Sequence, residues 1–412
     1  MNLIEEDMNR EYTRKENRMQ NYEQIRAIIK MIQLIIEAMR KGRLGEIDIQ
    51  NLQLTVEEVN FILYHVRRLR FQRDYDLSNE QEYLDFVEEL ESLIIIWNQS
   101  MERRIGKSVD VEFWDTYEFF GYANLDDIYQ MVVEYFMKLP EGLRIEFLAL
   151  PHRYLFLKNK IDYTKNDFSL IAEYIEMMAN NVDKYKWLYE HLADYRSKVI
   201  LNGIIRYWFR FDAGNLHALC EGAFSDYYDL DILKCDENTV FVDLGAYNGD
   251  SVRDFINTYG VYKKVYAYEL TPATYQVLLQ NLADYSNIVP IQKGISAKPG
   301  IMYVNNVANK AGNCILDSGD TAVEITTLDE DIKETISVIK MDIEGAEKDA
   351  LMGAERHIKQ EKPKMLISSY YLSEDIFEIP YMIQSMRDDY KFYMRFNGHN
   401  GLWPCDYVLF AV

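Results

Sequence analysis

Short apolar runs alternate with amphipathic helical patterns from residue 236 to residue 412, and this alternation constrains the fold more than any other feature. The runs that we interpret as strands are TVFVDLG, KVYAYEL, NIVPIQKG, ISVIKMDI, KMLISSYY, KFYMRF and DYVLFAV. The helical patterns are DSVRDFINTYG, TPATYQVLLQNLADY, AEKDALMGAERHIKQ and IFEIPYMIQSMRDDY. Together they predict a mostly parallel sheet with helices on both faces. The loop between the last two runs is too short for a crossover helix, so they should form an antiparallel hairpin at the end of the sheet.

The first quarter of the chain, residues 1–105, reads as a helical bundle. The segment YEQIRAIIKMIQLIIEAM carries an apolar stripe at helical spacing, and two capping boxes precede further apolar segments, Thr55 with Glu58 and Ser78 with Gln81. Three amphipathic helices with short connections predict an antiparallel bundle. Its stripes can pack inside the bundle or against a second copy of the chain, so we expect an assembly domain and a homo-oligomer formed through it.

Residues 106–235 combine helical patterns with many aromatic side chains, as in FWDTYEFFGYANLDDIYQMVVEYFMKLP and YKWLYEHLADYRSKVILNGIIRYWFRF. This pattern is typical of a core and of a surface that packs on, or leads into, the domain that follows. Flat rings also suit the faces of sugars. A substrate cleft lined by tyrosine and tryptophan is therefore an alternative that the pattern leaves open.

Charge and composition argue against several partners and locations. The 412 residues carry a formal net charge of -22, which repels the phosphates of nucleic acid. No run approaches the ~20 apolar residues of a membrane span, and the charged N-terminus is unlike a secretory signal. The 4 cysteines are widely spaced without C-x-x-C, which argues against disulfides and a zinc site. We expect a cytoplasmic protein with no nucleic-acid partner.

The turn after the first apolar run, in VFVDLGAYNGDS, has the form D-x-G-x-x-x-G instead of the dinucleotide fingerprint G-x-G-x-x-G. Its glycines, Gly245 and Gly249, let backbone and ligand approach closely. Its flanking carboxylates, Asp243 and Asp250, would repel a pyrophosphate and attract a cation. A nucleoside with a positive charge fits this pattern, and S-adenosylmethionine is such a ligand because it carries a sulfonium and an ammonium group.

Glu269 ends the second run, about 20 residues after the glycine turn. An acidic residue at this place accepts hydrogen bonds from ribose hydroxyls. Nicotinamide and methionine cofactors are both held in this way, so Glu269 alone does not separate them. The missing fingerprint and the acidic flanks of the turn favour the methionine cofactor. The alternative is that Asp243 and Glu269 only end their strands at the surface.

Five segments together resemble the FkbM-type family of S-adenosylmethionine-dependent methyltransferases: VFVDLGAYNGDS, VYAYEL, TTLDE, ISVIKMDIEGAEKDALMGA and IFEIPYMI. The likeness spans roughly residues 225–412, and IKMDIEGAE is its most specific part. The resemblance implies a Rossmann-like seven-stranded methyltransferase sheet with an antiparallel last strand. It also implies O-methylation, often of hydroxyls or carboxylates of sugars or natural products.

The resemblance also assigns residues to the cofactor. It places five residues in the cofactor loop, namely Asp243, Gly245, Ala246, Gly249 and Asp250. It places Glu269 at the ribose.

The segment VIKMDIEGAE ends the fourth run at the carboxyl edge of the predicted sheet, where open α/β sheets bind ligands. Alternation along a strand puts Lys340 and Asp342 on one face, and Asp342 and Glu344 lie beside the methyl group. A sugar hydroxyl needs correct placement and loss of its proton. Either Asp342 or Glu344 is a candidate base. Asp342 is also a candidate ligand of the cofactor's ammonium or of substrate hydroxyls. Lys340 is a candidate for orienting a substrate carboxylate or for holding Asp342 in place.

Other interpretations of this edge stay open. Lys340, Asp342 and Glu344 can form an ion network that only closes the strand end, and two carboxylates fall short of a metal site, so no metal is expected. In many relatives the fifth strand ends in Tyr-His. Here Tyr371 stands where that histidine would fall, and we count it among the catalytic candidates. His399 in the last loop is a further candidate base.

The sequence therefore predicts all-α regions 1–105 and 106–235 before a methyltransferase domain, 236–412. The expected activity is S-adenosylmethionine-dependent O-methylation of a glycan, sugar nucleotide or polyhydroxyl metabolite. The alternative is a noncatalytic or assembly protein that retains the fold, which the missing histidine favours and the intact KMDIEGAE segment disfavours. Acidic charge and the lack of an N/D-P-P-Y-like motif disfavour a nucleic-acid methyltransferase, whereas N-methylation of an amine stays open.

Overall fold

The computed structural model describes residues 109–145, 147, 169–220, 224, 227–304, 321–398 and 404–412. All of them lie in the second of the two units into which the chain divides, Lys107–Val412. The bundle and oligomer contacts expected for residues 1–105, and the candidate base His399, fall outside the described residues.

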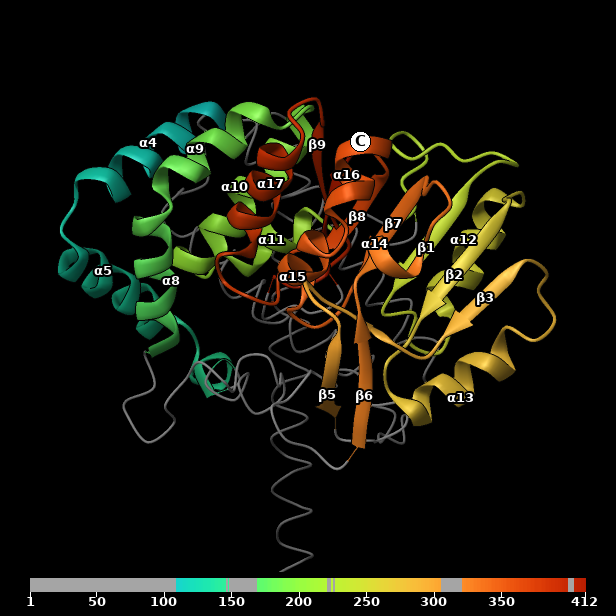
Figure 1. Cartoon of the computed structure of the whole chain (residues 1–412). Coiled ribbons are helices and arrows are strands. Elements are labelled where there is room, and N and C mark those ends of the chain that lie inside the picture. Colours follow the sequence, from blue (N-terminus) through green and yellow to red (C-terminus); the bar gives the residue numbers. More distant parts are fainter. Residues whose placement is uncertain are drawn as a thin grey trace, which may run out of the picture. The chain divides into compact units, whose positions relative to one another are not determined.

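Seven strands form one sheet in the order β3-β2-β1-β7-β8-β10-β9 (Figure 1). Their bounds are β1 Val240–Leu244, β2 Lys264–Tyr268, β3 Ile288–Ile291, β7 Val338–Met341, β8 Lys364–Ser368, β9 Phe392–Phe396 and β10 Tyr407–Ala411. The neighbours from β3 to β8 are parallel, whereas β10 runs antiparallel to β8 and to β9. The predicted mostly parallel seven-stranded sheet and its antiparallel hairpin are confirmed.

The centre of the sheet is β1, whose five residues are all buried. A strand covered on both faces reads as a continuous apolar run, which is what VFVDL shows apart from its aspartate. Helices α12 (Asp250–Tyr259) and α13 (Pro272–Asn281) follow β1 and β2. The ring of Phe241 on β1 stacks on Phe255 of α12 with 4.3 Å between centroids. The chain continues from β1 to β2 and β3 on one side and later to β7 and β8 on the other side, so the strand order reverses between β1 and β7. In such a sheet the ligand-binding crevice lies at the carboxyl ends of the strands at this reversal.

The remaining helices of this domain are α14 (Leu328–Asp331), α15 (Glu347–Met352), α16 (Glu355–Glu361) and α17 (Asp375–Met386). The single helix expected over AEKDALMGAERHIKQ is instead two helices, α15 and α16, divided at Gly353. A Cβ atom at Gly353 would lie 2.2 Å from the carbonyl oxygen of Ser296. The helix is interrupted where the chain passes this distant backbone.

A second, three-stranded sheet has the order β4-β6-β5 and was missed in the sequence. Its strands are β4 Gly294–Ile295, β5 Gly300–Val304 and β6 Thr321–Thr326, and β5 and β6 lie side by side in Figure 1. Ile301 and Tyr303 on β5 are 61% and 40% exposed. The apolar run of β5 was not interpreted as a strand, and in the structure these side chains lie at the surface.

The elements described between residues 109 and 218 are all helices: α4 Val109–Tyr122, α5 Leu125–Lys138, α8 Ser169–Asn180, α9 Val182–His191, α10 Tyr195–Arg210 and α11 Ala213–Ala218. None of the helices in the described ranges combines the length and apolar character needed to span a bilayer.

Helix α10 is joined to strand β9 by a buried ion network. The guanidinium of Arg395 on β9 donates from Nε to Asp229 at 2.6 Å and from Nη2 to Asp194 at 2.8 Å. Asp194 caps α10 by accepting the backbone N–H of Ser197 at 2.8 Å. The cation on the edge strand therefore holds the start of the helix.

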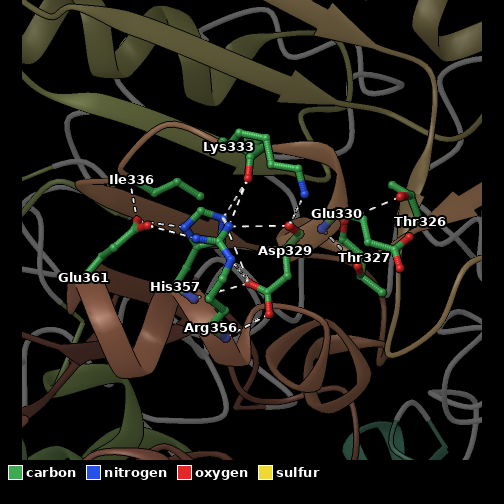
Figure 2. A network of polar contacts seen from close by, with 10 residues as sticks. Thr326, Thr327, Asp329, Glu330, Lys333, Ile336, Arg356, His357 and Glu361 are labelled. Atoms are coloured by element: carbon green, nitrogen blue, oxygen red, sulfur yellow. Dashed lines mark hydrogen bonds and ion pairs between the residues drawn. The ribbon is translucent and has the colours of Figure 1, made fainter.

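A second polar network stabilises the amino end of β7 (Figure 2). The fully buried ring of His357 lies with Nδ1 2.7 Å from Glu361 Oε2, and this oxygen also accepts the N–H of Ile336 at 2.8 Å. Asp329 accepts the backbone N–H of Arg356 at 2.8 Å, which ties α14 to α16. The network fixes the end of β7 that lies away from the candidate site.

Candidate functional site

The turn after β1 packs against the carboxyl ends of β2 and β7. Gly245 and Gly249 have φ angles of 80° and 86°, in the left-handed region that favours glycine. The N–H groups of Gly245 and Ala246 donate to the carbonyl of Tyr268, at 3.1 and 2.8 Å. A Cβ atom at Gly245 would lie 1.9 Å from the carbonyl oxygen of Asp342. Position 245 therefore requires glycine, and the turn keeps its backbone close to the carboxyl edge.

Asp243 and Lys340 form an ion pair beneath this turn. Their Oδ1 and Nζ atoms are 3.0 Å apart, and both residues are buried. Asp243 also accepts from the hydroxyl of Ser251 at 2.5 Å, and Lys340 donates to the carbonyl of Gly245 at 2.9 Å. Burial raises the pKa of Asp243. Burial lowers the pKa of Lys340, but attraction to Asp243 and then to Asp342 outweighs this, so its pKa is also raised. These two charges face each other inside the fold and hold the turn from below.

Asp250 and Ala246 occupy opposite surroundings on the same turn. Asp250 opens α12, is exposed, and accepts the backbone N–H of Ser251 at 2.8 Å. Ala246 is fully buried. Of the two carboxylates predicted beside the turn, Asp250 is the one that meets solvent.

Glu269 lies directly after β2, with only 6% of its surface exposed. Its Oε1 accepts the N–H of Thr271 at 2.7 Å, and the backbone of Tyr247 in the glycine turn lies near enough to favour its charged form. Burial raises the pKa of the Glu269 carboxyl, and these contacts oppose the shift. Glu269 is therefore a fixed, largely buried acceptor that ties the end of β2 to the turn, unlike a strand-ending residue at the surface.

Asp342 lies directly after β7, and its N–H donates to the carbonyl of Leu244 at 3.0 Å. Its two carboxylate oxygens accept from two phenols, Oδ1 from Tyr371 at 2.5 Å and Oδ2 from Tyr227 at 2.7 Å. The hydroxyl of Tyr227 also lies 3.0 Å from Ser368 Oγ. The predicted pair Asp342 and Tyr371 is thus brought together, and Tyr227 joins it.

Glu344 and Gly345 turn the chain from β7 towards α15 with φ angles of 60° and 100°. A positive φ is uncommon for a residue with a Cβ atom. A Cβ atom added at Gly345 would lie 3.7 Å from Tyr371 Cβ. Burial raises the pKa of Tyr371 well above its ordinary value, and the negative charges of Asp342 and Glu344 add to this shift. The predicted residues Asp342, Glu344 and Tyr371 thus share one environment.

Several acidic residues behind this edge were missed in the sequence. Glu347 is fully buried and accepts the N–H of Ile343 at 2.9 Å, and burial raises its pKa well above the ordinary value. Asp375 pairs with Lys348 at 3.0 Å, and burial raises the pKa of Asp375 to about 6. Within the described ranges, no group of three or more His, Cys, Asp or Glu side chains is arranged to hold a metal ion.

A groove of about 540 Å³ lies between α8 and the start of α17. It is lined by Glu173, Glu176, Met177, Asn180, Asn181, Ser373, Glu374 and Glu378. The hydroxyl of Ser373 donates to Glu173 at 3.1 Å, and Lys184 pairs with Glu378. One wall of the groove is formed by residues that come soon after Tyr371 in the chain, and the other wall is formed by α8 of the helical region.

Comparison with solved structures identifies the fold. The methyltransferase FkbM from Methylobacillus flagellatus KT has a TM-score of 0.51 and 24% identity, covering 59% of this chain and 62% of that one. This chain thus spans less than two thirds of its length. An rRNA methylase from Streptococcus thermophilus has a TM-score of 0.30 and 17% identity, covering 43% and 87%. Fibrillarin of Aeropyrum pernix, solved with natively bound S-adenosyl-L-methionine, has a TM-score of 0.28 and 14% identity, covering 43% and 67%.

The sequence was also compared with curated proteins and with family models. No curated protein matches the chain significantly. Residues 243–395 match the family model described as "Methyltransferase FkbM domain", and the match runs from the last residues of β1 into β9. The predicted resemblance is confirmed: residues 243–395 match the family model of the methyltransferase FkbM domain, and they lie on a Rossmann-like sheet.

Proposed function

We propose that this domain transfers a methyl group from S-adenosylmethionine to a hydroxyl of a glycan or similar polyhydroxyl metabolite. The observation that carries the proposal is the row of fixed groups along the carboxyl edge of β2, β1 and β7. Glu269, the glycine turn and Asp342 follow one another there. Adjacent strands are about 4.8 Å apart, so the row is roughly 10 Å long, a span suited to a nucleoside joined to an amino acid.

The residues present fit this cofactor. Gly245 lets the turn pack directly against the Asp342 backbone, which keeps the turn at the carboxyl edge of the sheet. Glu269 is an anchored carboxylate that can accept both ribose hydroxyls. Ala246, Gly249 and the exposed Asp250 complete the turn beside it. We assign Asp243 and Lys340 to the support of this turn, because their charges are paired in the interior.

The chemistry belongs to the edge between β7 and β8. When bound, the cofactor supplies an electrophilic methyl group on its sulfonium. The chain must place the acceptor hydroxyl in line with it and take up the hydroxyl proton. Asp342 and Glu344 are the proposed carboxylates for holding the cofactor's ammonium and for accepting that proton. Tyr371 fixes Asp342 through its hydrogen bond.

The groove between α8 and α17 supports a polyhydroxyl acceptor. Its lining is mostly carboxylates and carboxamides, and two of the carboxylates, Glu378 and Glu374, pair with Lys184 and Lys348. Such groups exchange hydrogen bonds with hydroxyls, while carboxylates repel anions. A neutral or amino-bearing glycan therefore suits this polar lining.

The test is a two-step experiment on the full chain. Calorimetric titration with S-adenosylmethionine, S-adenosylhomocysteine and NADH comes first, and we expect heat from the first two only. Methyl transfer is then measured on neutral glycans, amino-bearing glycans and sugar nucleotides. We expect product with the first or second group. Binding of NADH alone would contradict the cofactor, and cofactor binding without methyl transfer to any acceptor would favour the noncatalytic alternative.

A further inference from the structure

Tyr227 precedes β1 and lies outside residues 243–395, yet its side chain reaches the candidate site. Its hydroxyl donates to Asp342 Oδ2 at 2.7 Å and lies 3.0 Å from Ser368 Oγ. These two partners follow β7 and end β8, respectively. A residue from the segment before the domain thus contributes to the carboxyl edge of the sheet.

The carboxylate of Asp342 is held on both sides by neutral donors. Tyr371 donates to Oδ1 at 2.5 Å, and Tyr227 donates to Oδ2. Burial raises the pKa of both phenols well above the ordinary value, and the nearby Asp342 carboxylate adds to the shift. Both phenols therefore keep their protons at neutral pH and act as donors without removing the negative charge of Asp342.

The lysine nearest to this pair is committed elsewhere. Lys340 Nζ lies 5.2 Å from the centre of the Tyr227 ring, pairs with Asp243 at 3.0 Å and donates to the Gly245 carbonyl at 2.9 Å. Attraction to Asp342 also raises the pKa of Lys340, but within the described residues no ion pair joins the two. In the part of the chain that the structure describes, the hydrogen-bond donors to the Asp342 carboxylate are the two phenols. Asp342 is thus an oriented anion beside the glycine turn.

We propose that Tyr227 is a positioning residue: with Tyr371 it fixes Asp342 as the anion that binds the ammonium group of the cofactor's amino-acid part. This inference rests on the proposed function and assigns Asp342 a binding role. Glu344 is then the proposed base that takes up the proton of the acceptor hydroxyl. Fixed dipoles around a charged group are already oriented when the ligand arrives, so little reorganisation opposes binding. A lysine in place of Tyr227 would neutralise Asp342, as Lys340 does for Asp243.

Two ligands separate positioning from a general structural role. S-adenosylhomocysteine carries the amino-acid part with its ammonium, whereas 5′-methylthioadenosine has the same nucleoside and lacks that part. Calorimetric titration of the full-length Tyr227→Phe variant should show about 10-fold weaker binding of S-adenosylhomocysteine, from the loss of a charge-assisted hydrogen bond. Binding of 5′-methylthioadenosine should stay within about 2-fold of the wild type.

The matched control is Tyr259→Phe on α12, which removes a phenol hydrogen bond to the carbonyl of Leu233, 3.1 Å long. It should change neither affinity. In an Asp342→Asn background, Tyr227→Phe should weaken S-adenosylhomocysteine binding by less than about 2-fold, because effects that act through one group are not additive.

Three outcomes would overturn the inference. They are equal loss of both ligands in Tyr227→Phe, unchanged affinity for both, or a full 10-fold loss that persists beside Asp342→Asn. If the wild-type protein binds neither ligand, the proposed cofactor itself is wrong and this inference falls with it. Wild-type binding together with any of the three outcomes leaves the proposed function intact.

Discussion

Two partly buried networks of aspartates differ in the groups that pair with their carboxylates. At the joint between α10 and β9, Asp194 and Asp229 share the guanidinium of Arg395, at 2.8 and 2.6 Å. At the carboxyl edge of the sheet, Asp342 is held by the phenols of Tyr227 and Tyr371. The first network is closed by a cation of the chain. The second keeps an oriented negative charge.

The difference separates groups that stabilise the fold from groups that can bind. A buried carboxylate that is paired with a cation attracts a charged ligand only weakly. Removal of that cation strongly destabilises the fold, because an uncompensated charge stays buried. A carboxylate with neutral donors keeps its charge, and a positively charged ligand can complete the pairing. The network of Asp329, Arg356, His357 and Glu361 in Figure 2 belongs to the first kind, because an arginine lies among its carboxylates.

The largest expected effect is on the closed network. Replacement Arg395→Met removes the cation shared by Asp194 and Asp229 and leaves Asp229 with Arg196, 3.9 Å away, so the free energy of unfolding should fall by about 3 kcal/mol. Urea denaturation measures this loss. The control Arg387→Met removes one of the two cations that pair with Asp389 at the surface, and it should change the free energy of unfolding much less because solvent screens such pairs. Equal losses in the two variants would remove the distinction between the networks.

The second effect concerns Asp375, whose charge is only partly compensated by Lys348. Burial raises its pKa to about 6 from 3.8, so between these values the folded state binds a proton that the unfolded state does not. The free energy of unfolding should therefore fall as the pH rises from about 4 to 6, by roughly 3 kcal/mol from this group. Asp375→Asn should remove that slope. An unchanged slope would show that Asp375 does not cause it.

The third effect tests the turn that lies beside Asp342. Gly245→Ala drives a Cβ atom towards the Asp342 carbonyl, so affinity for S-adenosylhomocysteine should fall at least about 100-fold, or ~2.7 kcal/mol. Gly260→Ala is the control, because Gly260 also has a positive φ, 71°, and no heavy atom within 4 Å of its added Cβ. It should lose some stability and keep its affinity. A similar loss of affinity in both would point to backbone strain instead of the clash.

The smallest effect sharpens the role of the other anchored carboxylate. Glu269→Gln keeps the shape of the side chain and removes the charge that is proposed to hold the ribose. Loss of charge-assisted hydrogen bonds should weaken S-adenosylhomocysteine binding by about 1.5–3 kcal/mol in calorimetry. Glu334→Gln, near the amino end of β2 where Glu334 pairs with Lys264, is the control and should bind normally. Normal binding by Glu269→Gln would place the ribose elsewhere.

The sequence identified the parts of the site that depend on neighbouring residues. The glycine turn and Glu269 each follow a strand directly, so their spacing and the strand pattern were enough. Asp342 and Glu344 were identified for the same reason. Their convergence with Tyr371 followed from the order of the strands, since the ends of parallel neighbours meet at one edge.

Contacts between distant residues were not predictable in this way. Tyr227 reaches Asp342 across 115 positions, and no motif marks it. The break at Gly353 depends on the backbone of Ser296, and the strand β5 (Gly300–Val304) shows apolar side chains at the surface. In each case the tertiary neighbour, and not the local pattern, determines the structure.

One matched pair of substitutions tests the central claim that the oriented anion at the carboxyl edge binds the cofactor. Calorimetric titration with S-adenosylhomocysteine, beside urea denaturation, is carried out on Asp342→Asn and Asp229→Asn. We expect Asp342→Asn to lose at least about 10-fold in affinity with a stability change below ~1 kcal/mol. Asp229→Asn should lose stability and keep wild-type affinity. Wild-type affinity in Asp342→Asn, or loss of affinity in Asp229→Asn alone, would contradict the account.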